Sequence, residues 1–187
     1  MSLIIKKYGS AYVASIENIQ TLAQHICQTT QAGNSVVVVV PAMVTITDPW
    51  LKLADEISTN LNLQERDLLL AAGEQVSIAL LSMALQELGQ PAISLTVAQV
   101  RMVTEAKHTS ERPFHIQTER IKRHLNDGKV VVIGFQGIGI TEELEITILE
   151  RGEMDTSIVA LAAALKASHC EIYTDCCTFL QQTPELF

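Results

Sequence analysis

The stretch Gly33-Asn-Ser-Val-Val-Val-Val-Val-Pro41 decides the fold class of this chain. Its five consecutive valines form a short run of β-branched residues, which is typical of a strand buried on both faces, as in a parallel sheet. Gly33 and Asn34 end the helical pattern that precedes the run, and Pro41 ends the run itself. The sequence therefore predicts an α/β protein in which residues 36–40 form a buried strand.

Strands and helices are predicted to alternate outward from this run. Short apolar runs predict further strands at residues 3–7, 92–96, 129–135 and 170–174, and helical spacing predicts helices at 14–30, 48–57, 64–88, 118–127 and 155–167. A hairpin is expected at 140–149, turning at Glu142 and Glu143, whereas 97–117 and 175–187 have no clear period. Alternation of this kind indicates a mostly parallel sheet with helices on both faces.

Two of these helices have features of their own. Asp48 is expected to be the N-cap of the helix at 48–57, with Pro49 at its first helical position. The helix at 64–88 is apolar nearly all round after Val76, which indicates a core helix, and Gly73 is the point at which it could break.

Composition narrows the classes of function. The chain has 187 residues, 48% hydrophobic and 4% aromatic, so one domain with an aliphatic core is the simplest expectation. A net charge of −8 and the lack of a long basic run argue against nucleic acid as a partner. Neither an uninterrupted apolar run of ~18 residues nor a signal peptide is apparent, so we expect a cytoplasmic protein. The four cysteines lack a disulfide-scaffold spacing and are expected to be reduced.

Four stretches carry a resemblance to a known family: Gly73-Glu-Gln-Val-Ser-Ile-Ala-Leu-Leu81, Thr118-Glu-Arg-Ile-Lys-Arg-His-Leu125, Gly134-Phe-Gln-Gly137 and Asp155–Leu165. The chain resembles the aspartate kinases of the amino-acid kinase superfamily. That resemblance implies a three-layer αβα sandwich and phosphoryl transfer from MgATP to the side-chain carboxylate of aspartate, the step that opens lysine, threonine and methionine biosynthesis. Family members are longer and usually carry ACT regulatory domains, so we expect residues 1–187 to be a single truncated domain without one.

The first functional loop of the family is Lys-Phe-Gly-Gly-Thr-Ser, and here it is Lys7-Tyr-Gly-Ser-Ala-Tyr12. The resemblance implies that Lys7 neutralises the transferring phosphate and that Gly9 contacts the nucleotide. A solvated lysine at a strand end is the alternative for Lys7. Ser10 replaces a glycine that allows close backbone approach, and Tyr12 brings a bulky ring where small groups face the substrate.

The second loop is Ser-Ala-Met-Gly-Gly-Thr-Thr-Asp in many members, and here it is Pro41-Ala-Met-Val-Thr-Ile-Thr-Asp48. Val44 replaces a glycine and Ile46 replaces a substrate-facing threonine, while Thr47 is kept and is assigned to substrate binding by the resemblance. β-Branched residues do not readily adopt the positive φ that glycine allows. The loop is therefore expected to differ in shape or to be strained.

Three further residues match substrate-binding positions of the family. Glu74 matches the glutamate that holds the amino group of aspartate, and Phe135 matches a position that lines the substrate. Arg112 matches the arginine that grips the α-carboxylate, a role suited to the bidentate guanidinium. The alternatives are that Glu74 caps a helix and that Arg112 makes a surface ion pair.

The phosphate loop departs most from the family. Gly-Arg-Gly-Gly-Ser-Asp-Thr-Thr, whose backbone N–H groups cradle phosphate at a helix N-terminus, is here Glu150-Arg-Gly-Glu-Met-Asp-Thr-Ser157. A carboxylate about 4 Å from a phosphate charge costs about 4 kcal/mol at an effective dielectric constant of about 20. Glu150 and Glu153 should therefore oppose phosphate, although Glu153 could instead stabilise the helix start. Asp155 keeps the catalytic aspartate position and is also a good N-cap.

The strand that leads to the nucleotide ends in Tyr173-Thr-Asp175, which matches the family and assigns Thr174 and Asp175 to nucleotide binding. The second acid and the glycine that follow in the family are absent. If the chain is active, ATP and Mg²⁺ are its cofactors. His169 and three cysteines nearby offer metal ligands, but without the spacing of a zinc site, so no metal centre is predicted.

Three hypotheses follow for the function. The first is an aspartate-kinase-like protein with impaired or lost catalysis, which binds a ligand such as aspartate or a related amino acid, or pairs with a related kinase subunit or with itself. The second is an active kinase, of altered substrate or completed by a partner, which the retained Lys7, Glu74, Arg112 and Asp155 favour. The third is a structural homodimer in which a second copy covers an exposed sheet edge.

Overall fold

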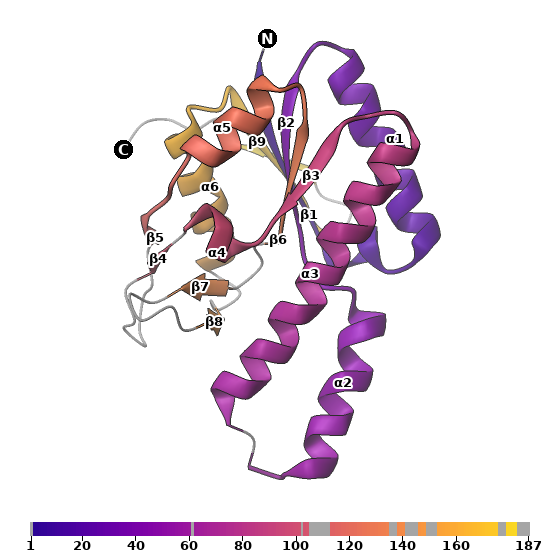
Figure 1. Cartoon of the computed structure of the whole chain (residues 1–187), viewed down its shortest axis with the longest axis vertical. Helices are drawn as coiled ribbons and strands as arrows, with labels where there is room; N and C mark the ends of the chain where they lie inside the picture. Colours follow the sequence, from indigo (N-terminus) through magenta and orange to yellow (C-terminus); the bar gives the residue numbers. More distant parts are fainter. Residues whose placement is uncertain are drawn as a thin grey trace.

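A computed structural model describes most of the chain (Figure 1). The described residues are 2–60, 62–101, 103–104, 113–134, 138–140, 146–148, 153–175 and 179–182.

A six-stranded sheet forms the centre of the molecule. Its strands are β1 (Leu3–Tyr8), β2 (Ser35–Val40), β3 (Ala92–Leu95), β6 (Val130–Gly134), β9 (His169–Tyr173) and β10 (Phe179–Gln182). They lie in the order β10-β9-β1-β2-β6-β3, and every pairing is parallel except that of β10 with β9. The mostly parallel sheet predicted from the alternating pattern is confirmed, and β10 lies in the part of the sequence that had no clear period.

Helices cover both faces of this sheet and complete the expected three layers (Figure 1). On one face lie α1 (Ile16–Gln31) and α3 (Leu63–Glu87), and on the other lie α4 (Val97–Val100), α5 (Glu119–Asn126) and α6 (Glu153–Leu165). The valine run shows why both faces need a cover. Val36, Val38 and Val40 pack in the α1 and α3 layer, whereas Val37 and Val39 pack in the α5 and α6 layer, because successive strand side chains point to opposite faces.

A second, smaller sheet lies beside the first. It is made of β4 (Val103–Thr104), β5 (Pro113–His115), β7 (Ile138–Ile140) and β8 (Ile146–Ile148), in the order β5-β4-β7-β8. Strands β7 and β8 pair antiparallel, Ile140 opposite Ile146, as the predicted hairpin requires. Its expected turn at Glu142 and Glu143 lies outside the described residues.

Helix α2 (Val44–Ile57) begins earlier than predicted. Met43 is its N-cap and Pro49 lies inside it, so the assignment of Asp48 as N-cap and Pro49 as first helical residue is wrong. A tertiary contact accounts for the difference, because the Met43 backbone N–H donates to Ser77 Oγ of α3 at 3.0 Å and fixes the loop just before Val44. The loop is not strained, since none of residues 41–48 has a positive φ, and its expected difference in shape from the family stays a prediction.

Helix α3 is continuous through Gly73, which does not break it. A Cβ at Gly73 would collide with the Thr47 methyl group and would lie 3.1 Å from Ala42 Cβ. Gly73 therefore allows the close approach of α2 and its preceding loop to α3. By length and composition α3 could cross a membrane, but Ile78, Leu81 and Leu85 pack it onto the sheet as a core helix.

Candidate functional site

The candidate residues gather where the parallel strands end. Lys7 lies near the end of β1, the Pro41–Met43 loop follows β2, Gly134 ends β6, and Thr174 and Asp175 directly follow β9. The carboxyl ends of parallel strands meet at one edge of a sheet, where ligands of open α/β proteins bind. The fold thus brings both halves of the predicted site to the same edge.

Lys7 and Asp155, predicted as the catalytic pair, are in contact. Lys7 Nζ lies 2.5 Å from Asp155 Oδ1, joining residues 148 positions apart. The Lys7 side chain is 12% exposed and that of Asp155 is 57% exposed, so the solvated lysine considered for Lys7 is wrong. Asp155 is the third residue of α6 rather than its N-cap. The pair holds the start of α6 against the end of β1.

A tight turn at Gly9 holds the carboxylate of Asp175. The Ala11 backbone N–H donates to Asp175 Oδ1 at 2.9 Å, and Ser10 Oγ donates to Oδ2 at 2.9 Å. Gly9 N–H donates to the Tyr173 carbonyl at 2.8 Å. A Cβ at Gly9 would collide with the same carboxylate, so only glycine fits this close approach. Gly9 and Asp175, both assigned to the nucleotide, therefore lie against each other.

The Tyr12 ring belongs to an aromatic cluster. Tyr8 stacks on Tyr173 with ring centroids 4.6 Å apart, and Tyr12 contacts both rings at 5.2 and 6.0 Å. Burial, followed by the neighbouring Tyr173 and Glu171 side chains, raises the pKa of Tyr8 above its ordinary value. With His25 and Asn18, Tyr12 also lines a surface hollow of about 380 Å³ on α1. The large ring at residue 12 therefore packs with other aromatic rings.

A buried charge network beside this cluster was not predicted. Lys6, which is only 4% exposed, lies opposite Glu171 in the register of β1 and β9, and Lys6 Nζ is 3.0 Å from Glu171 Oε2. The Tyr173 hydroxyl donates to the same oxygen at 2.7 Å, and His169 Nε2 lies 3.2 Å from Oε1. Burial alone would raise the pKa of Glu171, but hydrogen bonds from Tyr173 and Lys6 outweigh it and lower that pKa. The adjacent Lys6-Lys7 pair in a strand is the sequence signal, since one of the two must face inward.

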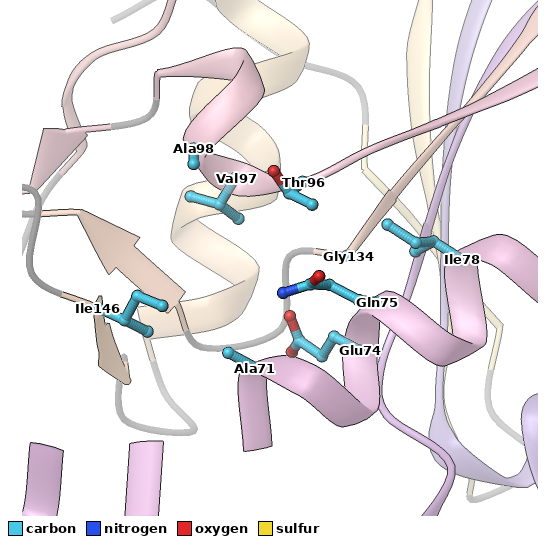
Figure 2. A pocket seen from close by; sticks show the side chains of 9 residues that line it. All are labelled: Ala71, Glu74, Gln75, Ile78, Thr96, Val97, Ala98, Gly134 and Ile146. Atoms are coloured by element: carbon cyan, nitrogen blue, oxygen red, sulfur yellow. The ribbon is translucent and has the colours of Figure 1, made fainter. Parts of the chain in front are cut away.

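Glu74 lies on the opposite side of the site, in a small pocket between α3, α4 and β8 (Figure 2). The pocket has a volume of about 70 Å³ and is lined by Ala71, Glu74, Gln75, Ile78, Thr96, Val97, Ala98, Gly134 and Ile146. Figure 2 shows Glu74 and Gln75 reaching from α3 into it. Glu74 is buried in the middle of α3, so it does not cap a helix.

Gly134 lies directly beside the Glu74 side chain. A Cβ on Gly134 would lie 3.2 Å from Glu74 Cβ and 3.5 Å from Glu74 Oε2. The absence of a side chain at the end of β6 therefore leaves room for a carboxylate. Together these groups place a buried carboxyl group beside a small recess.

Thr47 is not part of this recess. Its hydroxyl donates to the Met43 carbonyl at 3.2 Å and its methyl group lies against Gly73. Its assignment to substrate binding stays a prediction, as do those of Arg112 and Phe135, which lie outside the described residues together with Glu150.

No metal centre is apparent in the part of the chain that the structure describes, where no cluster of three or more metal-ligand residues occurs. Cys27 and Cys170 are both buried free thiols. Burial, followed by the charges of Glu171 and Asp155, raises the pKa of Cys170 to about 11. Its thiol is therefore protonated at neutral pH and a poor metal ligand.

Comparison with known proteins gives a consistent result. The profile of the amino acid kinase family matches residues 2–177. The aspartokinase of Geobacillus stearothermophilus is 51% identical over 176 residues, which are 94% of this chain and 43% of that protein. The chain spans less than half the length of this curated relative.

Two solved structures share the fold. The crystal structure of aspartate kinase from Synechocystis has a TM-score of 0.75 and 54% sequence identity, over 93% of this chain and 28% of that one. E. coli aspartokinase III, solved with aspartate and ADP, has a TM-score of 0.74 over 92% of this chain and 49% of that one. At 23% identity, the second comparison supports the fold alone.

Proposed function

This chain belongs to the amino acid kinase family, and we propose that within it the chain is an aspartate-kinase-like protein that binds an amino acid but is impaired in phosphoryl transfer. Aspartate or a related amino acid is the proposed ligand, because the relatives at about half identity are aspartokinases. The proposal has two parts: the recess at Glu74 binds the amino acid, and the turn at Gly9 is blocked to phosphate.

The hydrogen bond from Ser10 Oγ to Asp175 carries the proposal. The family has a glycine in place of Ser10, so this hydroxyl adds a bond, 2.9 Å long, that holds the carboxylate on the turn. Hydrogen bonds to charged groups contribute about 1.5–3 kcal/mol each. A nucleotide phosphate that approached Gly9 would have to displace Asp175 or accept its negative charge nearby.

Other features near Gly9 also oppose the binding of phosphate. The Lys7 ammonium is already paired with Asp155. Glu150 and Glu153 replace phosphate-loop glycines of the family, and each carboxylate near a phosphate costs about 4 kcal/mol at 4 Å and an effective dielectric constant of about 20. Mg²⁺ and ATP would be needed for catalysis, and Gly9, Thr174 and Asp175 would be the residues to receive the nucleotide.

The amino-acid side is better suited to its ligand. Glu74 is buried beside Gly134, and its carboxylate would pair with the ammonium group of the ligand. Arg112 would bind the α-carboxylate and Phe135 would line the side chain, as the resemblance implies. E. coli aspartokinase III has been solved with aspartate, which supports an amino acid as the class of ligand here.

Calorimetric titration with aspartate, and separately with MgATP, tests both parts. We expect aspartate to bind and a coupled assay of ADP release to detect no turnover. Glu74→Gln should abolish aspartate binding, whereas Glu65→Gln, an exposed acid on the same helix, should leave it unchanged. Turnover at the roughly 1–100 s⁻¹ typical of kinases would refute the impairment. A lack of aspartate binding in the unaltered chain would refute the ligand.

An active kinase completed by a partner subunit is the second candidate. The contact between Lys7 and Asp155 favours it, because the two proposed catalytic charges meet at the correct edge of the sheet. Mixing the chain with a full-length aspartate kinase from the same organism distinguishes the two. Completion predicts more ADP release than the full-length enzyme gives alone, and the impaired chain predicts no increase.

A further inference from the structure

All three tyrosines of the chain lie in one cluster, although only 4% of its residues are aromatic. Tyr8 is fully buried and stacks on Tyr173. Tyr12 contacts both of these rings, and the His25 ring of α1 meets Tyr173 edge-on at a centroid distance of 6.1 Å. Tyr12 is only half-buried and His25 is exposed. The cluster is therefore closed towards the sheet and open to solvent at these two rings.

The open side of the cluster is a hollow on the surface of α1, here called the α1 hollow. Its volume is about 380 Å³, which lies in the range of about 300–1,000 Å³ typical of small-molecule sites. The recess at Glu74 is several times smaller, at about 70 Å³. Aromatic and aliphatic side chains form most of the α1 hollow and polar groups form the rest, as in sites for small organic ligands. The lining residues are Ala11, Tyr12, Asn18, Thr21, Leu22 and His25.

Three polar side chains at the α1 hollow offer hydrogen bonds without a charge. Burial is the main cause that lowers the pKa of His25 below its ordinary value of 6.5, so its ring is neutral at pH 7 and has one donor and one acceptor nitrogen. The Asn18 amide donates to the Ala11 carbonyl, and its second N–H is not used by that bond. The Thr21 hydroxyl donates to the Glu17 carbonyl and keeps its lone pairs as acceptors. The hollow thus presents both donors and acceptors to a neutral ligand.

An anionic ligand is disfavoured in the α1 hollow. Ala11 belongs to both the hollow and the turn at Gly9, and its backbone N–H donates to Asp175 Oδ1 at 2.9 Å. No lysine or arginine is among the six described residues that line the hollow. A negatively charged group there would meet the Asp175 carboxylate without a lining cation to offset the repulsion. The ligand that fits is therefore uncharged.

We propose that the α1 hollow binds an uncharged planar heteroaromatic ring of the nucleobase type, packed against the Tyr12 and His25 rings. Aromatic rings attract each other in offset-stacked or edge-to-face arrangements with centroids about 4.5–7 Å apart, and the rings of the cluster already have such spacings. The amide of Asn18 combines a donor and an acceptor, the pattern with which asparagine binds the edge of adenine. This site is separate from the proposed amino-acid recess and needs no phosphate.

Calorimetric titration of the 187-residue chain with adenosine tests the proposal. We expect adenosine to bind, and adenosine monophosphate to bind several-fold more weakly, because its phosphate would approach Asp175. A chain that does not bind adenosine at millimolar concentration would overturn the proposal. Tighter binding of the monophosphate would also overturn it, because the ligand would then be held through its phosphate.

A pair of tryptophan variants tests the place of binding. Thr21→Trp puts a large ring into the α1 hollow from an exposed position of α1 and should weaken adenosine binding about tenfold or more, the effect of losing a base–aromatic contact. Gln20→Trp is the matched control, since Gln20 is exposed on α1 and does not line the hollow, and it should leave the affinity unchanged. Equal affinity of both variants, with circular dichroism like that of the unaltered chain, would overturn the proposal. Neither test measures aspartate binding or ADP release, so the outcome is independent of the proposed kinase-like function.

Discussion

The two ends of the candidate site differ in what fills them. At the proposed amino-acid end, a glycine at the end of β6 leaves space beside the buried carboxyl group of Glu74, in a recess of about 70 Å³. At the phosphate end, the turn at Gly9 is occupied by Asp175, and Lys7 is held by Asp155. Both ends lie at the same edge of the same sheet, so the fold does not cause the difference.

The side chains beside the turn at Gly9 cause the difference. Gly9 still allows a close approach, but the group that approaches is a carboxylate of the chain itself. An anion site that is already satisfied by an internal anion gains little from an external one, because the new ligand must first break charge-assisted hydrogen bonds. The recess at Glu74 places a carboxyl group beside a small space, which the proposed binding of an ammonium group would use.

The largest effect is expected from the two neighbouring lysines of β1. Lys6→Met should lower the free energy of unfolding by about 3 kcal/mol, because breaking a buried ion pair leaves the Glu171 carboxylate without its cation. Lys7→Met is the matched control, with a loss below about 1 kcal/mol, because Asp155 is largely exposed. Urea unfolding of both variants measures the difference. Equal losses would mean that the buried Lys6–Glu171 pair contributes no more to stability than the exposed Lys7–Asp155 pair.

The next largest loss of stability is expected from replacing glycines by alanine. Gly9→Ala and Gly73→Ala should each cost about 1–3 kcal/mol, the usual cost of forcing extra atoms into a packed site, because each new Cβ would collide with a neighbouring side chain. Gly134→Ala should cost less, since its contacts would lie at 3.2–3.5 Å and could relax. Thermal unfolding ranks the three. A Gly134 variant less stable than the other two would contradict the packing described at both ends.

Restoring a family residue should open the phosphate end. Ser10→Gly removes the hydroxyl that donates to Asp175, and we expect MgATP to bind about tenfold more tightly, equivalent to about 1.4 kcal/mol. Ser10→Ala also removes the hydroxyl but keeps a Cβ, so it separates the hydrogen bond from the space that a side chain takes. Calorimetric titration measures both. Unchanged affinity in both variants would show that the bond from Ser10 to Asp175 does not limit nucleotide binding.

The sheet could be predicted from the sequence because its signals are local. The valine run and the alternating helices fix the layers, and the structure confirms them. The start of α2 could not be predicted, because Ser77, more than thirty residues away in sequence, holds Met43 and overrides the Asp48-Pro49 signal.

The candidate site could be predicted only in part for a related reason. The motif match named Lys7 and Asp155, which do meet, and Glu74, which is buried in a recess. It did not name Lys6 and Glu171, because their pairing depends on the register of β1 against β9, two strands about 160 residues apart in sequence. The bond between Ser10 and Asp175 has the same origin, since it joins two loops that only the pairing of β1 with β9 brings together.

The smallest expected effect is a pH dependence at the phosphate end. His25 lies beside Tyr173, with ring centroids 6.1 Å apart, and burial, followed by the charge of Lys6, lowers its pKa below the ordinary 6.5. A histidine with a lowered pKa in the folded state contributes stability above pH 6.5, and this contribution is lost as the pH falls through the folded-state pKa. The lowered pKa of Glu171 adds a second loss below pH 4.5, its ordinary value. Urea unfolding from pH 7 to pH 3 should therefore show stability falling in two steps. His25→Asn should make the upper step smaller without removing it, because the pKa of His124 is also lowered, chiefly by burial. An unchanged upper step in that variant would assign it to a group outside the cluster of Tyr173 and Lys6.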